Sequence, residues 1–100
     1  MEAKTGKLTD SEIQSSLTGL PGWFLTAGKL HREFKFADFR QAFEFMAAAA
    51  PLIDKMDHHP EWCNVYNRVV VDLTTHDAAG ISQKDVDLAK LLDSTAFKFK

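Results

Sequence analysis

Cysteine is almost absent from this 100-residue chain, because Cys63 is its single example. One cysteine cannot form a disulfide within the chain, so the sequence indicates a reducing compartment. Its neighbours, Trp62 and Asn64, are not residues that would activate the thiol. We therefore expect Cys63 to be a structural residue that is buried or half-buried.

Long apolar runs are also missing from the chain. No stretch approaches the roughly 18 apolar residues that a membrane span needs. The N-terminus, Met1–Gly6, is polar and lacks the apolar centre of a signal peptide. The sequence therefore predicts no membrane association and a cytoplasmic protein, with the nucleus as a further compartment in a eukaryote.

Charge of one sign is not concentrated anywhere. The chain has 12 Lys and Arg against 14 Asp and Glu, and its cations are spread along its length. Nucleic-acid binding needs a basic face, so we expect no direct nucleic-acid partner. The sequence also lacks a glycine-rich phosphate loop, a nucleophile elbow and a Cys–His pair, which leaves histidines and carboxylates as candidates for chemistry.

Apolar residues make up 45% of the chain and aromatic residues 11%, which is enough for one hydrophobic core. A chain of this length is expected to form a single domain over 1–100, with 1–7 as a loose N-terminal tail. A domain so small buries only about 60–65% of its unfolded surface. Association with further copies would therefore help to stabilise it.

The first half of the chain predicts a helix, two strands and a second helix. Thr9 and Glu12 fit a capping box, which starts a short helix. Residues 23–26 and 29–36 should form a β-hairpin, because the second segment alternates with period two.

A long helix is predicted over 38–56, where apolar residues recur at steps of three and four. Pro51 should bend this helix, because proline removes a backbone hydrogen bond. Phe45 falls outside the apolar stripe. The stripe itself consists of Phe39, Ala42, Phe43, Met46, Ala49, Ala50, Ile53 and Met56.

Residues 62–75 are rich in β-formers and fit either one long strand or two strands broken near Tyr66, and periodicity does not decide between them. After a turn over 76–80, Ser82 and Asp85 resemble a capping box that starts the last helix. The order α-ββ-α-ββ-α predicts a two-layer α+β domain with a four-stranded antiparallel sheet and helices on one face. The other face of the sheet would be open.

Three of the four histidines flank this β-rich segment, with His58 and His59 before it and His76 after it. If the segment is a hairpin, its outer ends lie side by side and the three histidines converge. If it is one strand, they lie about 45 Å apart at roughly 3.3 Å per residue. Carboxylates gather around the same positions: Asp54, Asp57, Glu61, Asp77 and Asp85.

Each of these residues also has a purely structural interpretation. The two adjacent histidines could belong to a surface loop, Asp85 could only cap the last helix, and Trp23 could be an ordinary core aromatic. Two chemical interpretations compete with that one. The histidines and a carboxylate could bind a metal, although adjacent histidines tend to point apart. Alternatively, imidazoles tuned by carboxylates could transfer protons without a metal.

The combined spacing is more specific than any of its parts. Asp54-x3-His58-His59-Pro60, followed by Tyr66, His76 and Asp85, resembles the signature of the pterin-4a-carbinolamine dehydratase family. The segments D-H-H-P-E-W at 57–62, N-V-Y-N at 64–67 and T-H-D at 75–77 are similar to the same family. The resemblance extends from Leu8 to about Ala96.

The resemblance implies an enzyme that removes water from 4a-hydroxytetrahydrobiopterin and yields quinonoid dihydrobiopterin, without metal, nucleotide or redox cofactor. It implies an acid–base pair of His58 and His76, with His59 mainly holding the substrate. Asp54 and Asp85 would orient or polarise the histidines, and Asp85 is counted with the catalytic set. The remaining substrate contacts would come from Trp23, which would wall the pocket, and from Asp57, Thr74, Thr75 and Asp77.

The resemblance also implies assembly into a homodimer whose sheets join, or a homotetramer held through the long helix. Some animal members of the family stabilise dimers of a hepatic homeodomain transcription activator through that helix. In this chain the helix carries Ala47-Ala48-Ala49-Ala50-Pro51 in place of bulkier residues. An interaction module, acting as a transcription-factor cofactor or an assembly factor, is the alternative hypothesis.

Overall fold

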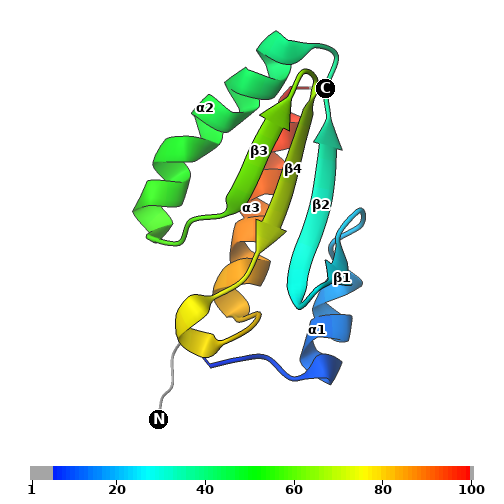
Figure 1. The fold of residues 1–100 in the computed structure, drawn as a ribbon, viewed down its shortest axis with the longest axis vertical. Helices are drawn as coiled ribbons and strands as arrows, with labels where there is room; N and C mark the ends of the chain where they lie inside the picture. Colours follow the sequence, from blue (N-terminus) through cyan, green and yellow to red (C-terminus); the bar gives the residue numbers. More distant parts are fainter. Residues whose placement is uncertain (1–5, 100) are drawn as a thin grey trace.

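The computed structural model describes residues 6–99, which fold into an α+β domain with a four-stranded antiparallel sheet (Figure 1). The elements follow the predicted order α-ββ-α-ββ-α, so the predicted fold class is confirmed. In chain order they are α1 (Asp10–Leu17), β1 (Phe24–Thr26), β2 (Lys29–Lys35), α2 (Phe39–Met56), β3 (Glu61–Val65), β4 (Arg68–Leu73), the 3-10 turn η1 (His76–Ala78) and α3 (Gln83–Phe97).

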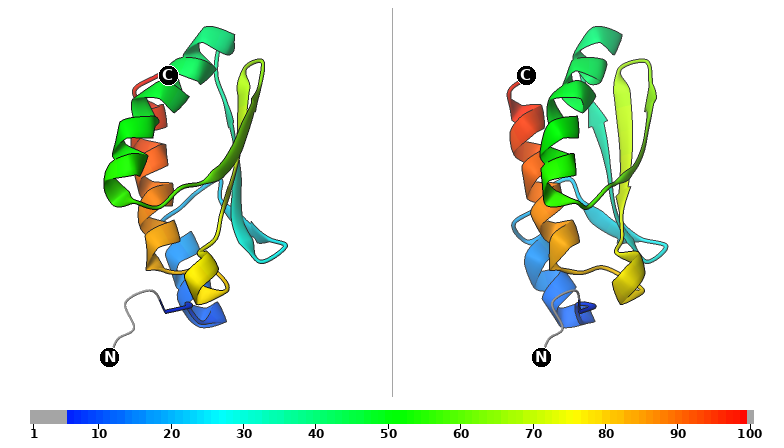
Figure 2. Two further views of the ribbon diagram at one scale, coloured as in Figure 1. Left: turned by 60° about the vertical axis from the view of Figure 1, so that its left-hand side comes forward. Right: turned by 90° about the vertical axis from the view of Figure 1, so that its left-hand side faces the viewer.

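The sheet has the strand order β1-β2-β4-β3, with all neighbours antiparallel. The β-rich segment 62–75 is a hairpin, because the chain reverses at Tyr66 and Asn67 between β3 and β4. Tyr66 has a φ of 52°, the left-handed conformation that such a tight turn requires. Helices α2 and α3 lie against one face of the sheet and leave the other face open (Figure 2).

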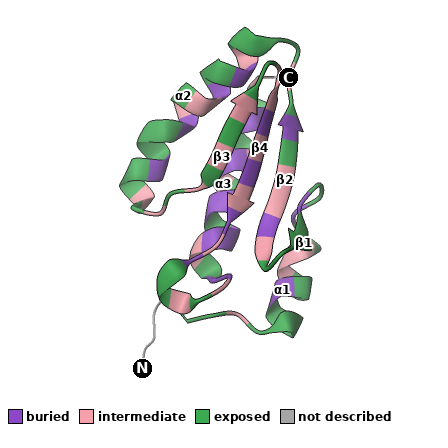
Figure 3. Cartoon of the chain, viewed as in Figure 1, coloured by how far each residue is buried: buried purple, intermediate pink, exposed green. Residues whose placement is uncertain are grey.

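The core lies between that covered face and the helices (Figure 3). Alternation with period two turns Val69, Val71 and Leu73 of β4 inward, where each is almost fully buried. Leu88 and Leu92 of α3 are fully buried on the helix side. Both capping boxes form, at Thr9–Glu12 and at Ser82–Asp85, which fixes where α1 and α3 begin.

The predicted apolar stripe of α2 is correct for Ala42, Ala49 and Ile53, which are buried, but wrong for the phenylalanines. Phe45 is fully buried, whereas Phe39 and Phe43 are 50% and 57% exposed. Packing against the sheet explains why Phe45 is buried, because its ring centroid lies 5.0 Å from that of Phe34 and 5.1 Å from that of Phe36. Ala42, Ala49 and Ile53 lie on the same buried side of the helix. Pro51 lies within the assigned helix, which runs on to Met56.

Two smaller expectations also need correction, for Cys63 and for Lys7. Cys63 is exposed, because its neighbour Trp62 takes the inward position of β3 and alternation turns Cys63 to the open face. The fourth histidine, His31, is partly buried, and its Nδ1 lies 2.8 Å from Asp72 Oδ1. Lys7 pairs with Ser82 in an isolated β-bridge instead of belonging to a loose tail, of which 1–5 lie outside the described residues.

Within 6–99, no helix combines enough length with enough apolar character to cross a membrane.

Candidate active site

A cleft of about 280 Å³ lies where the β3–β4 hairpin brings its outer ends together. Glu61 at the start of β3 pairs with Asp72 near the end of β4, so the loops before and after the hairpin are neighbours. All three predicted histidines therefore line one cleft. Its lining residues are Asp57, His58, His59, Thr74, Thr75, His76, Asp77 and Lys84.

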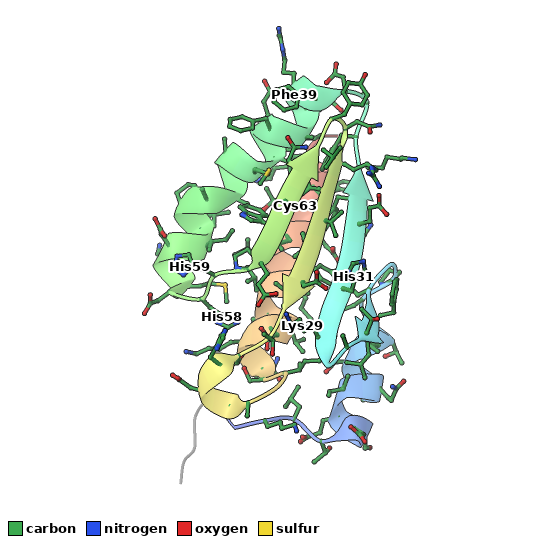
Figure 4. All side chains as sticks on the ribbon, viewed as in Figure 1. Lys29, His31, Phe39, His58, His59 and Cys63 are labelled. Atoms are coloured by element: carbon green, nitrogen blue, oxygen red, sulfur yellow. The ribbon has the colours of Figure 1, made fainter. Side chains whose placement is uncertain are left out.

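The end of α2 sends the two adjacent histidines in different directions. Asp57 closes the helix in the left-handed conformation, with φ 56°, and its N–H donates to the carbonyls of Ile53 and Asp54. His58 then lies beside η1, whereas His59 lies against the last turn of α2 (Figure 4). The two imidazoles thus face different partners, although they follow one another in the chain.

His58 is held by a buried carboxylate on α3. Its Nε2 lies 2.6 Å from Asp85 Oδ1, and the two side chains are 11% and 0% exposed. A buried carboxylate that accepts from a histidine fixes the tautomer and orientation of that ring, as in a catalytic triad. With Nε2 engaged by Asp85, Nδ1 is the nitrogen of His58 that is left for a substrate.

The other oxygen of Asp85 is fully occupied by the protein. Asp85 Oδ2 accepts from the Thr75 hydroxyl at 2.8 Å and from the Ser82 N–H at 2.9 Å. The Thr75 and Ser82 hydroxyl oxygens are 2.7 Å apart, and the Lys84 N–H donates to the Ser82 oxygen. Every polar group of this buried network therefore has a partner, which keeps Asp85 rigidly in place.

The remaining two histidines are more accessible. His59 Nε2 lies 2.9 Å from Asp54 Oδ1, and these side chains are 59% and 79% exposed. His76 begins η1 and is exposed, with Thr75 preceding it as the N-cap residue. The cleft thus contains one imidazole that is held by a buried carboxylate and two imidazoles that are exposed to solvent.

The chain was then compared with known protein families. The sequence model described as "Pterin 4 alpha carbinolamine dehydratase" matches residues 6–95. The chain belongs to the pterin-4a-carbinolamine dehydratase family. A protein of Solibacter usitatus (strain Ellin6076) that carries the family name is 59% identical over 92 residues, which cover 92% of this chain and 97% of that protein. Another from Novosphingobium aromaticivorans is 52% identical over 90 residues, which cover 88% and 94%.

A solved structure agrees with this membership. It is described as a transcriptional coactivator/pterin dehydratase from Brucella melitensis, and it has a TM-score of 0.87 and 45% sequence identity to this chain. The match covers 91% of this chain and 99% of the Brucella chain. The dehydratase family therefore accounts for both the sequence and the fold of almost the whole chain.

Two residues are placed differently from the sequence-based expectation for a family member. Trp23 was expected to wall the pocket, but it is 5% exposed and packs edge-on against Phe34, while its indole N–H donates to Asp93 at 2.8 Å. Trp23 therefore does not line this cleft. Lys84 does line it and was not predicted. A lysine in the first turn of a helix, where the dipole disfavours a cation, is the signal that could have indicated it.

The hypothesis of a metal site requires several of these side chains to be grouped around one ion. Among 6–99, no three His, Cys, Asp or Glu side chains are grouped so that they could hold a metal ion. His58 and His59 each face a carboxylate of their own, on α3 and on α2 respectively.

Proposed function

We propose that this protein dehydrates 4a-hydroxytetrahydrobiopterin to quinonoid dihydrobiopterin by histidine acid–base catalysis. The observation that carries the proposal is the convergence of His58, His59 and His76 on one cleft, with His58 bound to the buried Asp85. Membership of the family supports the substrate class. In this proposal the enzyme acts in the cytoplasm, in the recycling of tetrahydrobiopterin, as a homodimer or homotetramer.

The reaction needs two proton transfers at adjacent atoms of the pterin. A base removes the proton from N5, and the electron pair of that N–H bond forms the C4a=N5 double bond. The C4a–O bond breaks at the same time, and an acid protonates the departing hydroxyl so that it leaves as water. Each general acid or base contributes typically about 10²–10⁴ in rate. In this proposal the reaction requires no metal, nucleotide or redox cofactor.

We assign the two proton transfers to His58 and His76. Asp85 stabilises a protonated His58 ring, because the carboxylate accepts the Nε2–H while Nδ1 takes up a proton. His58 is therefore suited to act as the base. His76, exposed across the cleft, would supply the proton for the hydroxyl. One imidazole would accept a proton while the other donates one, so the pair covers both transfers.

The other lining residues would bind the pterin. His59 is exposed and is held only by the exposed Asp54, so its imidazole is free to contact the substrate as that pair adjusts. Asp57, Thr74 and Asp77 would accept or donate hydrogen bonds to the ring, partly through their backbone groups. Thr75 is 5% exposed and its hydroxyl is engaged with Asp85, so its contribution would come from the backbone.

Turnover of 4a-hydroxytetrahydropterin by the purified protein tests the proposal directly. Replacing His58 or His76 by Ala should slow dehydration by at least roughly tenfold, because each removes a proton carrier. His31→Ala is a matched control, since that imidazole pairs with Asp72 and is not among the residues that line the cleft. An unchanged rate in both His58→Ala and His76→Ala would contradict the mechanism.

Protein binding through α2 is a second candidate function. Phe39 and Phe43 are half exposed on this helix, with ring centroids 5.8 Å apart, and Leu52 is 40% exposed. The description of the Brucella neighbour also names a coactivator. A partner that co-purifies at 1:1 stoichiometry, together with no turnover of the carbinolamine, would favour this function over catalysis.

A further inference from the structure

A second hollow adjoins the histidine cleft on the other side of His76. Its volume is about 330 Å³, and it shares Thr74, Thr75 and His76 with the cleft. The second hollow lies at the end of the sheet where β4 leads into η1 and where the β1–β2 hairpin turns (Figure 1). Its remaining lining residues are Ala27, Gly28, Lys29, Ala79 and Gly80.

The backbone around both hollows is held in an unusual conformation. Among the described residues, four other than glycine have a positive φ, and three of these four line the hollows. They are Asp57 in the cleft (φ 56°) and Ala27 and Ala79 in the second hollow (φ 52° and 57°). Such residues each cost on the order of 1–3 kcal/mol and cluster at functional sites. Residues with a positive φ therefore line the second hollow as well as the proposed active site.

The chemistry of the substrate connects the two hollows. Sites for drug-sized ligands have volumes of roughly 300–1,000 Å³, so the cleft, at about 280 Å³, suits a bicyclic ring with little room beyond it. In a pterin, the substituted carbon C6 is bonded directly to N5, the atom that loses its proton. A substituent at C6 therefore leaves the ring next to the histidines that carry protons, and one of these, His76, borders the second hollow.

We propose that the second hollow is the subsite for the C6 substituent of the pterin, an inference that rests on the proposed dehydratase function. Alanine and glycine at Ala27, Gly28 and Ala79 leave the space that a short alkyl chain needs. The Lys29 ammonium, which bonds Glu61 Oε1 at 2.6 Å, has further N–H donors for hydroxyls on that chain. The subsite would thus select pterins with a short hydroxylated side chain over those with a methyl group.

Filling the hollow tests the subsite. Ala79→Leu places a larger side chain just after η1, and Ala27→Leu places one in the β1–β2 turn, both at residues that line the hollow. In either variant, KM for 4a-hydroxytetrahydrobiopterin should rise at least about tenfold, equivalent to about 1.4 kcal/mol of binding. KM for the 6-methyl carbinolamine and kcat for both substrates should stay within about twofold, because neither Ala27 nor Ala79 lines the cleft that would hold the ring.

Two further variants serve as controls for the filled hollow. Ala47→Leu adds the same side chain at an exposed position of α2 outside both hollows, and it should change neither KM. Ala50→Leu does the same at a second exposed position of α2 outside both hollows and should also change neither KM.

The possible outcomes separate the subsite from the enzyme itself. If both filled variants, folded as judged by circular dichroism, raise KM equally for the two substrates, or for neither, the subsite is wrong while the dehydratase function stands. If the wild-type protein turns over no pterin, the proposed function fails and the subsite with it. A selective rise for the substrate with the longer chain supports both.

Discussion

At the scale of single residues, the carboxylate of Asp85 connects the start of α3 to the proposed chemistry. Isolated burial of an ionised carboxylate costs several kcal/mol. Asp85 is fully buried but accepts hydrogen bonds from Ser82, Thr75 and His58. The first two bonds belong to the fold, because they cap the helix and attach the strand end to it. The third points to the cleft, so the stability of the helix start and the orientation of His58 depend on one group.

Asp85→Asn separates these two roles. An amide keeps the size of the side chain but presents an NH₂ group to one set of donors, so either His58 or the Ser82–Thr75 pair loses its acceptor. We expect kcat to fall at least about tenfold, with a smaller change in KM, and unfolding stability to fall by about 1–3 kcal/mol. Steady-state kinetics and urea unfolding measure these effects. Asp87→Asn changes an exposed carboxylate on the same helix and should alter neither. An unchanged kcat in Asp85→Asn would remove Asp85 from the mechanism.

A second carboxylate, that of Asp93, should make the free energy of unfolding depend on pH. Burial raises the pKa of Asp93 above its ordinary 3.8, against the opposing effects of the Trp23 indole N–H and the Arg32 guanidinium. A raised carboxyl pKa means that the folded state binds this proton more tightly than the unfolded state. The contribution of Asp93 to stability is therefore greatest at low pH and declines as the pH rises from about 3.8 through the folded pKa.

Asp93→Asn removes this titration. The free energy of unfolding of the wild type, minus that of the variant, should therefore decrease as the pH rises through that window and become constant above it. Urea unfolding of both proteins between about pH 3.5 and 6.5 measures the difference. A difference that grows with pH would mean that the ion pair with Arg32, rather than burial, dominates the carboxylate.

At the scale of elements, α2 shows how the sheet selects the buried side of a helix. Apolar residues occupy more than one side of α2, so periodicity permits two stripes that differ by part of a turn. Phe45 is buried because it fits among Phe34, Phe36 and Trp62, with the Trp62 ring at a centroid distance of 6.3 Å. The bulky Phe43 remains outside. Long-range aromatic packing decided between the stripes.

A pair of phenylalanine variants tests that orientation of α2. Phe45→Ala should destabilise the protein by about 3–5 kcal/mol, because it removes a fully buried ring and leaves a cavity. Phe43→Ala makes the same chemical change at a position that is 57% exposed, and should shift stability by no more than about 0.5 kcal/mol. Thermal or urea unfolding provides the comparison. Equal costs at the two positions would mean that the helix packs with both sides covered.

Features that depend on neighbouring residues could be predicted from the sequence, and those that depend on docking could not. The capping boxes at Thr9 and Ser82 and the period of β2 are local, and the elements form where these signals place them. The sequence does not decide between a hairpin at Tyr66 and one long strand, because a positive φ at a tyrosine has no clear sequence signal. The same hairpin is the condition that brings His76 to His58.

In the candidate site, too, some features follow from local sequence and others depend on how the elements dock. The spacing of the histidines and of Asp85 carries the family resemblance, so those residues could be named from the sequence. The position of Lys84 in the cleft depends on how the first turn of α3 docks against the hairpin, and the burial of Trp23 depends on its bond to Asp93. Neither arrangement is encoded by spacing along the chain.

At the scale of the whole molecule, the domain is elongated and covered on one side only. Its extents are 44 × 25 × 20 Å, and β3 lies at one edge of a sheet whose outer face is open. Val65 and Tyr66, at the tip of the β3–β4 hairpin, are 54% and 64% exposed. Unpaired strand edges and exposed apolar side chains favour association with another chain.

We therefore expect the protein to form a dimer or tetramer at micromolar concentration. A small domain buries a smaller share of its surface than a large one, and association would cover the exposed edge and side chains. Because only the folded chain associates, the midpoint of thermal unfolding should rise with protein concentration. Sedimentation velocity gives the mass, and a dilution series of unfolding curves gives the linkage. A monomer whose midpoint is independent of concentration would show instead that the single layer of helices is sufficient to stabilise the sheet.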